Sequence, residues 1–317
     1  MTAPVSRFAP APTGLLHLGH VVNAIYVWGV TGAAGGRVLL RIEDHDRGRS
    51  RPEFERAILD DLDWLGFVPD EPSTDGFRAG PSSGRQSDRA VVYEEALERL
   101  RAAGLLYSCE CSRSASRLGG SERTRPTSGV GRVLSGPPGE TPEVWYPGTC
   151  REKGLEEGPG RGIRVRLNPS TERFVDLWRG LQAQKPLEQC GDLLARDRDG
   201  GWTYQFGVTV DDLAQGVTLV VRGDDLLAST GRQIQLARLL GRREPPRFLH
   251  HPLVMKTPTQ KLSKADRDTS VRDLRAAGRS AADIIGQAAY AAGLTDRDGP
   301  LPADRVAGLA AWSRLTG

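Results

Sequence analysis

Three stretches of the chain are apolar enough to be buried along their whole length. Residues 21–30 form a run long enough for a helix, whereas residues 37–42 and 217–221 are shorter and rich in valine, leucine and isoleucine. Runs of the second kind are typical of strands that are covered on both faces of a parallel sheet. The pattern therefore predicts one buried helix and two buried strands.

Amphipathic segments with helical spacing lie between these strands. One follows Ser50 and ends at Gly66, and another runs from Ser87 to Gly104. Alternating strands and helices predict an α/β fold with a doubly wound parallel sheet. Further elements are expected as strands at 163–167, 174–180 and 248–255, a helix from Ser229 or Thr230 to Gly241, and short helices within 265–317.

Residues 204–210 fit two structures. Tyr204, Phe206, Val208 and Val210 alternate as in a strand, but the same stretch is apolar enough for a buried helix. The pattern leaves both structures open.

Length and composition bound the class of protein. The 317 residues suffice for about two domains with a sizeable core. Because 43 lysines and arginines nearly balance 40 aspartates and glutamates, a nucleic-acid partner would need a local basic patch. The sequence contains no apolar run of membrane-spanning length and no signal-peptide pattern, so we expect a cytoplasmic protein with no membrane partner.

The first chemical signal lies at the entrance of the predicted helix, where His17, Gly19 and His20 stand close together. A helix N-terminus offers unpaired amide groups and the positive end of the helix dipole, and imidazoles can donate hydrogen bonds to phosphate oxygens. Gly19 would let a ligand approach the backbone closely. The stretch predicts a polyphosphate site, although so short a motif also arises by chance.

Charged residues follow both predicted buried strands. Glu43 comes directly after the first strand, and Arg222 comes directly after the second, followed by Asp224 and Asp225. Ligands bind at the carboxyl ends of strands in open α/β sheets. We therefore take Glu43 and Arg222 as site candidates and expect the two aspartates in a solvated turn.

Lys261 and Lys264 lie in an expected loop near the end of the chain. Two ammonium groups on a loop suit closure over a triphosphate, because each is a compact charge that can follow the leaving pyrophosphate. Taken alone, a lysine-rich tetrapeptide is more often a solvated surface loop.

Three of the four cysteines flank a segment of 112–149 that is rich in glycine, proline, serine and arginine and is expected to be a long loop. Such a cluster indicates a metal site in a reducing compartment, with free thiols as the alternative. The three are Cys109, Cys111 and Cys150. Zinc takes four ligands, so the fourth would be Cys190, a carboxylate, water or the phenolate of Tyr146.

The His-x-Gly-His, Arg-Ile-Glu-Asp and Lys-Leu-Ser-Lys motifs together resemble those of a class I aminoacyl-tRNA synthetase of the glutamyl type. The similarity extends from Arg7 to Lys264. Members that charge glutamine tend to carry Asp-Asp where this chain has Glu43 and Asp44, so the resemblance favours glutamate. It implies a Rossmann-type catalytic domain whose two halves span 1–104 and 191–264. An inserted zinc-binding subdomain would occupy 105–190, and a short helical region would occupy 265–317.

The resemblance also implies an amino-acid site. Arg7 would pair with a carboxylate of L-glutamate, and Glu43 would hold its α-ammonium group. The remaining contacts would come from Ala9, Ala11, Tyr204 and Arg222. Because Ala11 stands where the family usually has serine, one hydroxyl contact to the substrate is missing.

The same resemblance implies ATP and zinc sites. ATP, with Mg²⁺, would be contacted by His17, Gly19 and His20, and the lysine motif would stabilise its α-phosphate through Lys264, with Lys261 beside it. One Zn²⁺ would be held by Cys109, Cys111, Tyr146 and Cys150.

The expected activity follows from the length of the chain. Full-length glutamyl-tRNA synthetases continue past the lysine motif into anticodon-binding helices, and this chain stops soon after it. It is therefore similar to a truncated, monomeric paralogue that activates glutamate without tRNA and esterifies the queuosine base of the tRNA(Asp) anticodon. The alternatives are a tRNA-dependent synthetase fragment, a non-catalytic tRNA-binding paralogue, and a small nucleotidyltransferase that shares only the histidine motif.

Overall fold

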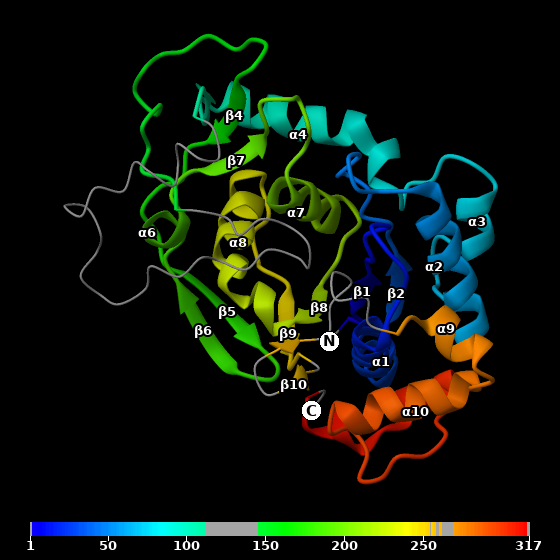
Figure 1. Ribbon diagram of the computed structural model, residues 1–317. Helices are drawn as coiled ribbons and strands as arrows, with labels where there is room; N and C mark the ends of the chain where they lie inside the picture. The colour runs from blue at the N-terminus through cyan, green and yellow to red at the C-terminus, as the bar shows by residue number, and fades with distance from the viewer. Residues whose placement is uncertain (1, 112–144, 254, 258–259, 262–268, 316–317) are drawn as a thin grey trace.

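The computed structural model describes residues 2–111, 145–253, 255–257, 260–261 and 269–315, and Figure 1 shows their arrangement. The chain begins with a parallel β-α-β unit made of β1 (Val5–Phe8), α1 (Leu18–Ala33) and β2 (Arg37–Leu40). The predicted buried helix and first strand are thus confirmed.

A second sheet contains four strands in the order β6, β5, β9, β8, in which only β6 is antiparallel to its neighbour. Their bounds are β5 (Glu172–Asp176), β6 (Gly180–Gln184), β8 (Leu219–Gly223) and β9 (Arg247–His251). The two sheets meet at β1 and β8. The amide of Thr218 donates to the carbonyl of Val5 and the Arg7 side chain reaches the carbonyl of Val221, so both strands run in the same direction.

Helices cover both faces of this parallel array (Figure 1). Val221 and Leu249 pack with the apolar side of α1, whereas the alternate positions Val220 and Phe248 pack with Ile234 of the opposite layer. Further helices are α2 (Pro52–Leu65), α3 (Thr74–Arg78), η1 (Gln86–Arg89), α4 (Ala90–Ala102), α7 (Tyr204–Ala214), η2 (Asp224–Ser229) and α8 (Thr230–Leu239). The doubly wound fold predicted from the sequence is confirmed.

Several local predictions are corrected. Residues 204–210 belong to helix α7, which settles the ambiguity in favour of a buried helix. The residue that precedes α2 is Arg51 rather than Ser50, and it makes no side-chain cap. Helix α4 begins at Ala90, because the residues around Ser87 form the 3₁₀ turn η1.

The predicted insertion contributes a small antiparallel sheet in the order β3, β4, β7, and the core of this sheet is shared with helices α4, α7 and α8. Its elements are β3 (Leu106–Cys109), β4 (Gly162–Val165), α6 (Pro186–Cys190) and β7 (Leu193–Arg196). The segment that was expected to be a long loop lies, over 112–144, outside the described residues.

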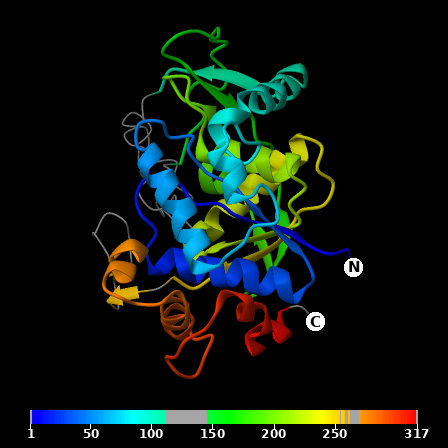
Figure 2. The ribbon, with the colours of Figure 1, turned by 90° about the vertical axis from the view of Figure 1, so that its right-hand side faces the viewer.

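The last part of the chain consists of short elements, of which α10 (Ala281–Ala291), η4 (Ala303–Gly308) and η5 (Ala310–Arg314) pack beneath α1 (Figure 2). The others are β10 (Met255–Thr257), β11 (Gln260–Lys261) and α9 (Val271–Ala276). The expected strand at 248–255 is confirmed as far as His251, where β9 ends; its extension to Met255 is wrong, because β10 pairs with β11. Within the described residues, no helix is long and apolar enough to cross a bilayer.

Trp312 packs this C-terminal region against helix α1. Its side chain is 1% exposed, and a Cβ added to Gly29 of α1 would lie 2.4 Å from the indole ring. We expect Trp312→Ala to lower the free energy of unfolding by about 3–5 kcal/mol, because a large side chain would leave a cavity at a tight contact. Denaturant titration measures this, and Trp178→Ala, at a side chain 44% exposed, is the control. Equal losses in the two variants would contradict the role of Trp312.

Candidate active site

The two histidines of the first motif are fixed at the start of α1. His17 is the N-cap residue, and its Nδ1 atom accepts the amide of Gly19 at 3.1 Å. The Nδ1 atom of His20 accepts the amide of His17 at 3.1 Å, and the two ring centroids are 3.9 Å apart. Because each Nδ1 atom accepts, the neutral rings carry their protons on Nε2. The predicted position at a helix entrance is confirmed.

The lysine motif cannot be placed by its side chains. Lys264 and the side chain of Lys261 lie outside the described residues, although the backbone of Lys261 forms part of β11. The chain after the motif does return to the histidines. Ser270 forms an antiparallel bridge with His17, and the amide of Val271 donates to the carbonyl of Leu16 at 2.8 Å.

Five parallel strands end at one edge of the sheets, and each delivers a polar side chain there. Two of these residues were predicted as site candidates because they follow buried strands. In strand register, Arg222 lies opposite His250, and Asp176 lies opposite Phe248, two positions before His250 on β9. The five residues are Arg7, Glu43, Asp176, Arg222 and His250. This edge is where open α/β sheets bind their ligands.

Arg7 and Glu43 belong to one buried network. Arg7 donates to Asp212 at 3.0 Å, and Arg41 donates to the same carboxylate at 2.6 Å and to Glu43 at 2.9 Å. Burial raises the pKa of Glu43 despite the nearby guanidinium groups of Arg41 and Arg7. Burial also opposes ionisation of Asp212, but Arg7 and Arg41 hold its pKa below the usual range. Glu43 is thus a buried acceptor suited to a cationic group.

Arg222 differs from the other buried arginines of the edge. Its side chain donates to Nε2 of His250 at 3.0 Å, to Oε1 of Gln233 at 2.7 Å and to Oγ1 of Thr230 at 2.9 Å. These acceptors are neutral, and within the described part of the chain Arg222 makes no ion pair. Burial lowers its pKa, and the neighbouring charge of Arg7 contributes to the lowering. An anion bound here would relieve both effects.

The other predicted contacts lie around the same edge. Tyr204, the first residue of α7, packs with Leu226, and its ring centroid is 6.0 Å from that of His45. The amide of Glu43 donates to the carbonyl of Pro10 at 3.1 Å, which holds the segment 9–11, with Ala9 and Ala11, beside the strand end.

Sequence reasoning missed the residues that support these candidates. Arg41 and His250 interrupt runs that were interpreted as buried strands, and Asp212 lies within an apolar stretch. A charged or polar residue inside a buried run needs a partner, and that signal could have identified them. Asp224, expected in a solvated turn, is half-buried and pairs with Arg179 at 2.5 Å.

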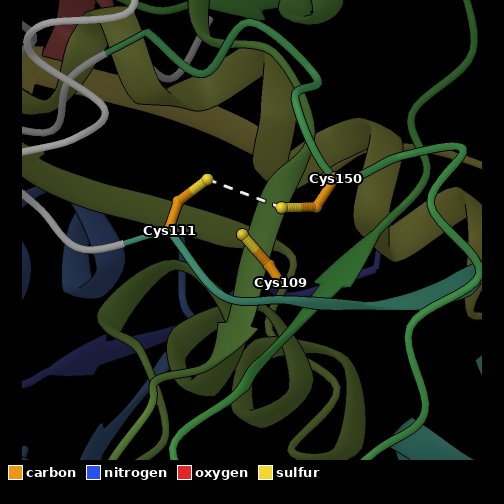
Figure 3. Close-up of side chains that lie close together, drawn as sticks. All are labelled: Cys109, Cys111 and Cys150. Atoms are coloured by element: carbon orange, nitrogen blue, oxygen red, sulfur yellow. Dashed lines mark hydrogen bonds between the residues drawn. The ribbon is translucent and has the colours of Figure 1, made fainter.

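Three of the predicted metal ligands are close together in the insertion (Figure 3). The sulfur atoms of Cys109, Cys111 and Cys150 lie within 4.8 Å of one another. The Tyr146 hydroxyl lies 3.5 Å from the Cys109 sulfur and accepts the Cys150 amide at 2.8 Å. Four ligands around a tetrahedral zinc are separated by roughly 3–4 Å, so this cluster fits such an ion. Cys190 donates instead to the carbonyl of Pro186 at 3.0 Å.

The surroundings of the cluster favour a thiolate at one cysteine. Burial raises the pKa of a thiol, but hydrogen bonds with Tyr146 and Arg164 hold the pKa of Cys109 below its ordinary value. The pKa of Cys111 is raised to about 12 by burial and by the neighbouring sulfurs of Cys150 and Cys109. A cation would reverse this second effect, because it stabilises neighbouring thiolates.

Comparisons with known proteins identify the class that this fold and edge define. Residues 5–285 match the family model for tRNA synthetases class I (E and Q), catalytic domain. A glutamate-tRNA synthetase structure from Elizabethkingia anophelis superposes with a TM-score of 0.75 at 25% identity. The match covers 98% of this chain and 66% of that one, so the chain spans slightly less than two thirds of that synthetase. The chain is a ligase of the class I aminoacyl-tRNA synthetase type.

More similar relatives define the particular group. The Glutamyl-Q tRNA(Asp) synthetase of Rhodobacter capsulatus is 39% identical over 88% of this chain and 98% of its own length. The protein of the same name from Symbiobacterium thermophilum is 41% identical over 93% of this chain and 88% of its own. The chain belongs to the Glutamyl-Q tRNA(Asp) synthetase family.

Proposed function

We propose that the chain activates L-glutamate with ATP in the absence of tRNA and then transfers the glutamyl group to the queuosine base of tRNA(Asp). The observation that carries the first half is the environment of Arg222. A buried guanidinium with only neutral hydrogen-bond partners, beside the second arginine Arg7, is a site for an acidic ligand. The names of the relatives support the second half.

The amino-acid site has the charges that glutamate requires. Arg7 and Arg222 would each receive a carboxylate, because guanidinium binds carboxylates through paired N–H groups. Glu43 would accept the α-ammonium group, with Tyr204 completing the pocket. Ala9 and Ala11 would contribute backbone contacts, since neither has a polar side chain.

ATP would lie with its phosphates at the start of α1. His17 and His20 would donate Nε2 protons to phosphate oxygens, and Gly19 would keep the approach open. The glutamate carboxylate oxygen would attack the α-phosphorus, the bond to the β-phosphate oxygen would break, and pyrophosphate would leave. A carboxylate needs no base for this attack, so the residues act by positioning and by charge stabilisation. Mg²⁺ bound to ATP would supply further charge neutralisation.

The lysine motif completes the proposal for ATP. Ser270, six positions after Lys264, lies against His17. Six residues span at most about 20 Å, and this short separation along the chain supports assigning the lysine motif to the same phosphate site. We propose that Lys264 stabilises the α-phosphate during the attack and that Lys261 assists it.

A labelled-transfer experiment tests the acceptor. With [¹⁴C]glutamate and ATP, we expect label in tRNA(Asp) that contains queuosine and none in tRNA(Asp) that contains guanosine at the same position. Label in tRNA(Glu) would instead favour the tRNA-dependent fragment. A non-catalytic tRNA-binding protein would label neither RNA.

The cysteine cluster is proposed to hold one structural zinc ion through Cys109, Cys111, Tyr146 and Cys150. Elemental analysis of purified protein should then find about one zinc per chain, because a tetrahedral site of this kind binds tightly. Cys150→Ser should lose the metal. Cys190→Ser is the matched control and should keep it, since that sulfur lies outside the cluster. Full zinc content in both variants would exclude the site.

We propose that the protein works as a monomer in the cytoplasm. None of the four cysteines forms a disulfide, as is typical of a reducing compartment, and both ATP and tRNA are available there.

A further inference from the structure

A chain of buried hydrogen bonds lies behind Arg222. Its three direct partners, His250, Gln233 and Thr230, are 0%, 7% and 0% exposed. His250 and Gln233 are held in turn by further buried side chains. The arginine that is proposed to bind glutamate is therefore oriented by the interior rather than by solvent.

Asp176 fixes the protonation of His250. The Nδ1 atom of His250 lies 2.7 Å from Oδ2 of Asp176, and its Nε2 atom receives the Nε–H of Arg222. A carboxylate only accepts and a guanidinium only donates, so the proton is on Nδ1 and Nε2 is an acceptor. Burial lowers the pKa of His250 to about 4, which keeps the ring neutral. The hydroxyl of Thr230 lies 3.2 Å from the same Nε2 atom.

Both carboxylate oxygens of Asp176 accept hydrogen bonds. Its Oδ2 atom also accepts the backbone amide of His250, and its Oδ1 atom accepts the amides of Trp178 and Arg179 at 2.9 Å. Burial opposes its ionisation, but the hydrogen bonds with His250 and these amides hold its pKa below the usual range. The Asp176 carboxylate accepts four hydrogen bonds and is held in one orientation, so the ring of His250 is fixed as well.

Gln233 is oriented in the same way from the other side. Arg222 donates to its Oε1 atom, so its Nε2 atom points away and donates to Oε1 of Gln205 at 2.7 Å. Gln205 then donates to the hydroxyl oxygen of Ser229 at 3.2 Å. The carboxylate of Asp176 and the guanidinium of Arg222 thereby set the donor and acceptor of each hydrogen bond between Asp176 and Ser229.

This arrangement decides what Arg222 offers to a ligand. A guanidinium has five N–H groups, and the described residues accept three of them. One N–H remains on each terminal nitrogen. A carboxylate can accept both, whereas the NH₂ group of a carboxamide would face a donor.

We propose that His250, Asp176 and Gln233 are positioning and specificity-determining residues that make Arg222 present donors only, and so select a carboxylate over the corresponding carboxamide. The inference rests on the proposed function, because it assumes that Arg222 binds glutamate.

Two substitutions of His250 separate orientation from packing. Asn places its amide where Nδ1 was, two bonds from Cβ, and so keeps the contact with Asp176 but loses the acceptor for Arg222. Gln places its amide where Nε2 was, three bonds from Cβ, and so keeps that acceptor. His251→Asn is the control, because His251 is equally buried but donates to the carbonyl of Pro252.

The measurement is ATP/pyrophosphate exchange with glutamate and with glutamine. For His250→Asn we expect KM for glutamate to rise about 10- to 100-fold, the effect of one hydrogen bond to a charged group, with kcat nearly unchanged and a smaller preference for glutamate over glutamine. His250→Gln should raise KM less than His250→Asn does, because it keeps the acceptor for Arg222 although it loses the contact with Asp176. Gln233→Met should behave like His250→Asn, which provides a second test if His250→Asn does not fold.

The outcomes separate the two proposals. Equal KM values in His250→Asn and His251→Asn, or equal losses in the Asn and Gln variants of His250, would overturn the positioning role. A wild-type protein with neither glutamate-dependent exchange nor a glutamate-induced rise in melting temperature would overturn the proposed function itself.

Discussion

Replacing Arg222 by methionine should lower kcat/KM for glutamate on the order of 10³-fold. Two charge-assisted hydrogen bonds to the substrate carboxylate would be lost, and each contributes about 1.5–3 kcal/mol. The Arg222 side chain is buried and has no carboxylate partner among the described residues. Its removal therefore leaves no unpaired protein carboxylate, and the main loss is the contact with the substrate. Steady-state exchange kinetics at saturating ATP measure the effect.

Arg242→Met is the control for this experiment. Arg242 is also an arginine whose pKa burial lowers, but it donates to the backbone carbonyls of Val217 and Glu244. Melting curves of both variants show whether folding is retained. An Arg222→Met protein that melts normally and keeps kcat/KM within tenfold of wild type would remove the basis for an acidic substrate.

Replacing His17 by asparagine should lower kcat for exchange about 10²- to 10³-fold, the usual effect of removing one donor to the transition state. Folding should survive, because asparagine is among the best N-cap residues and its oxygen can replace Nδ1 at the amide of Gly19. The variant therefore removes the Nε2 donor and retains the cap.

His17→Ala provides the matching comparison. It removes the cap as well, so we expect an additional loss of about 1 kcal/mol of stability with the same loss of kcat. If His17→Asn retained wild-type kcat while His17→Ala lost it, the histidine would serve only to cap α1, and its proposed contact with ATP would be wrong.

The elements predicted correctly are those whose burial is uniform or clearly one-sided. Helix α1 contains a long buried apolar stretch, and strands β2 and β8 consist mostly of buried valines and leucines. Helix α7 could not be distinguished from a strand, because Tyr204 to Asp211 are all buried and no polar face reveals the helical period. The end of β9 was missed because the apolar residues continue past His251 into the hairpin.

The site was predictable only in part for a related reason. Arg7, Glu43 and Arg222 were found through strand ends and family motifs, both of which are local in sequence. Most of their partners are not local: Arg7 meets Asp212 across 205 positions, and Arg222 meets His250 across 28. No pattern within a short window encodes such pairs, and only the parallel register of the strands brings them to one edge.

The central claim is that a buried pair of arginines receives glutamate beside an ATP site at the start of α1. The most direct measurement is ATP/pyrophosphate exchange by the wild-type protein, with glutamate, glutamine or aspartate, with and without tRNA. We predict exchange that requires glutamate, is negligible with the other two amino acids, and does not depend on tRNA. Exchange supported equally by glutamine, or no exchange with glutamate under either condition, would contradict the claim.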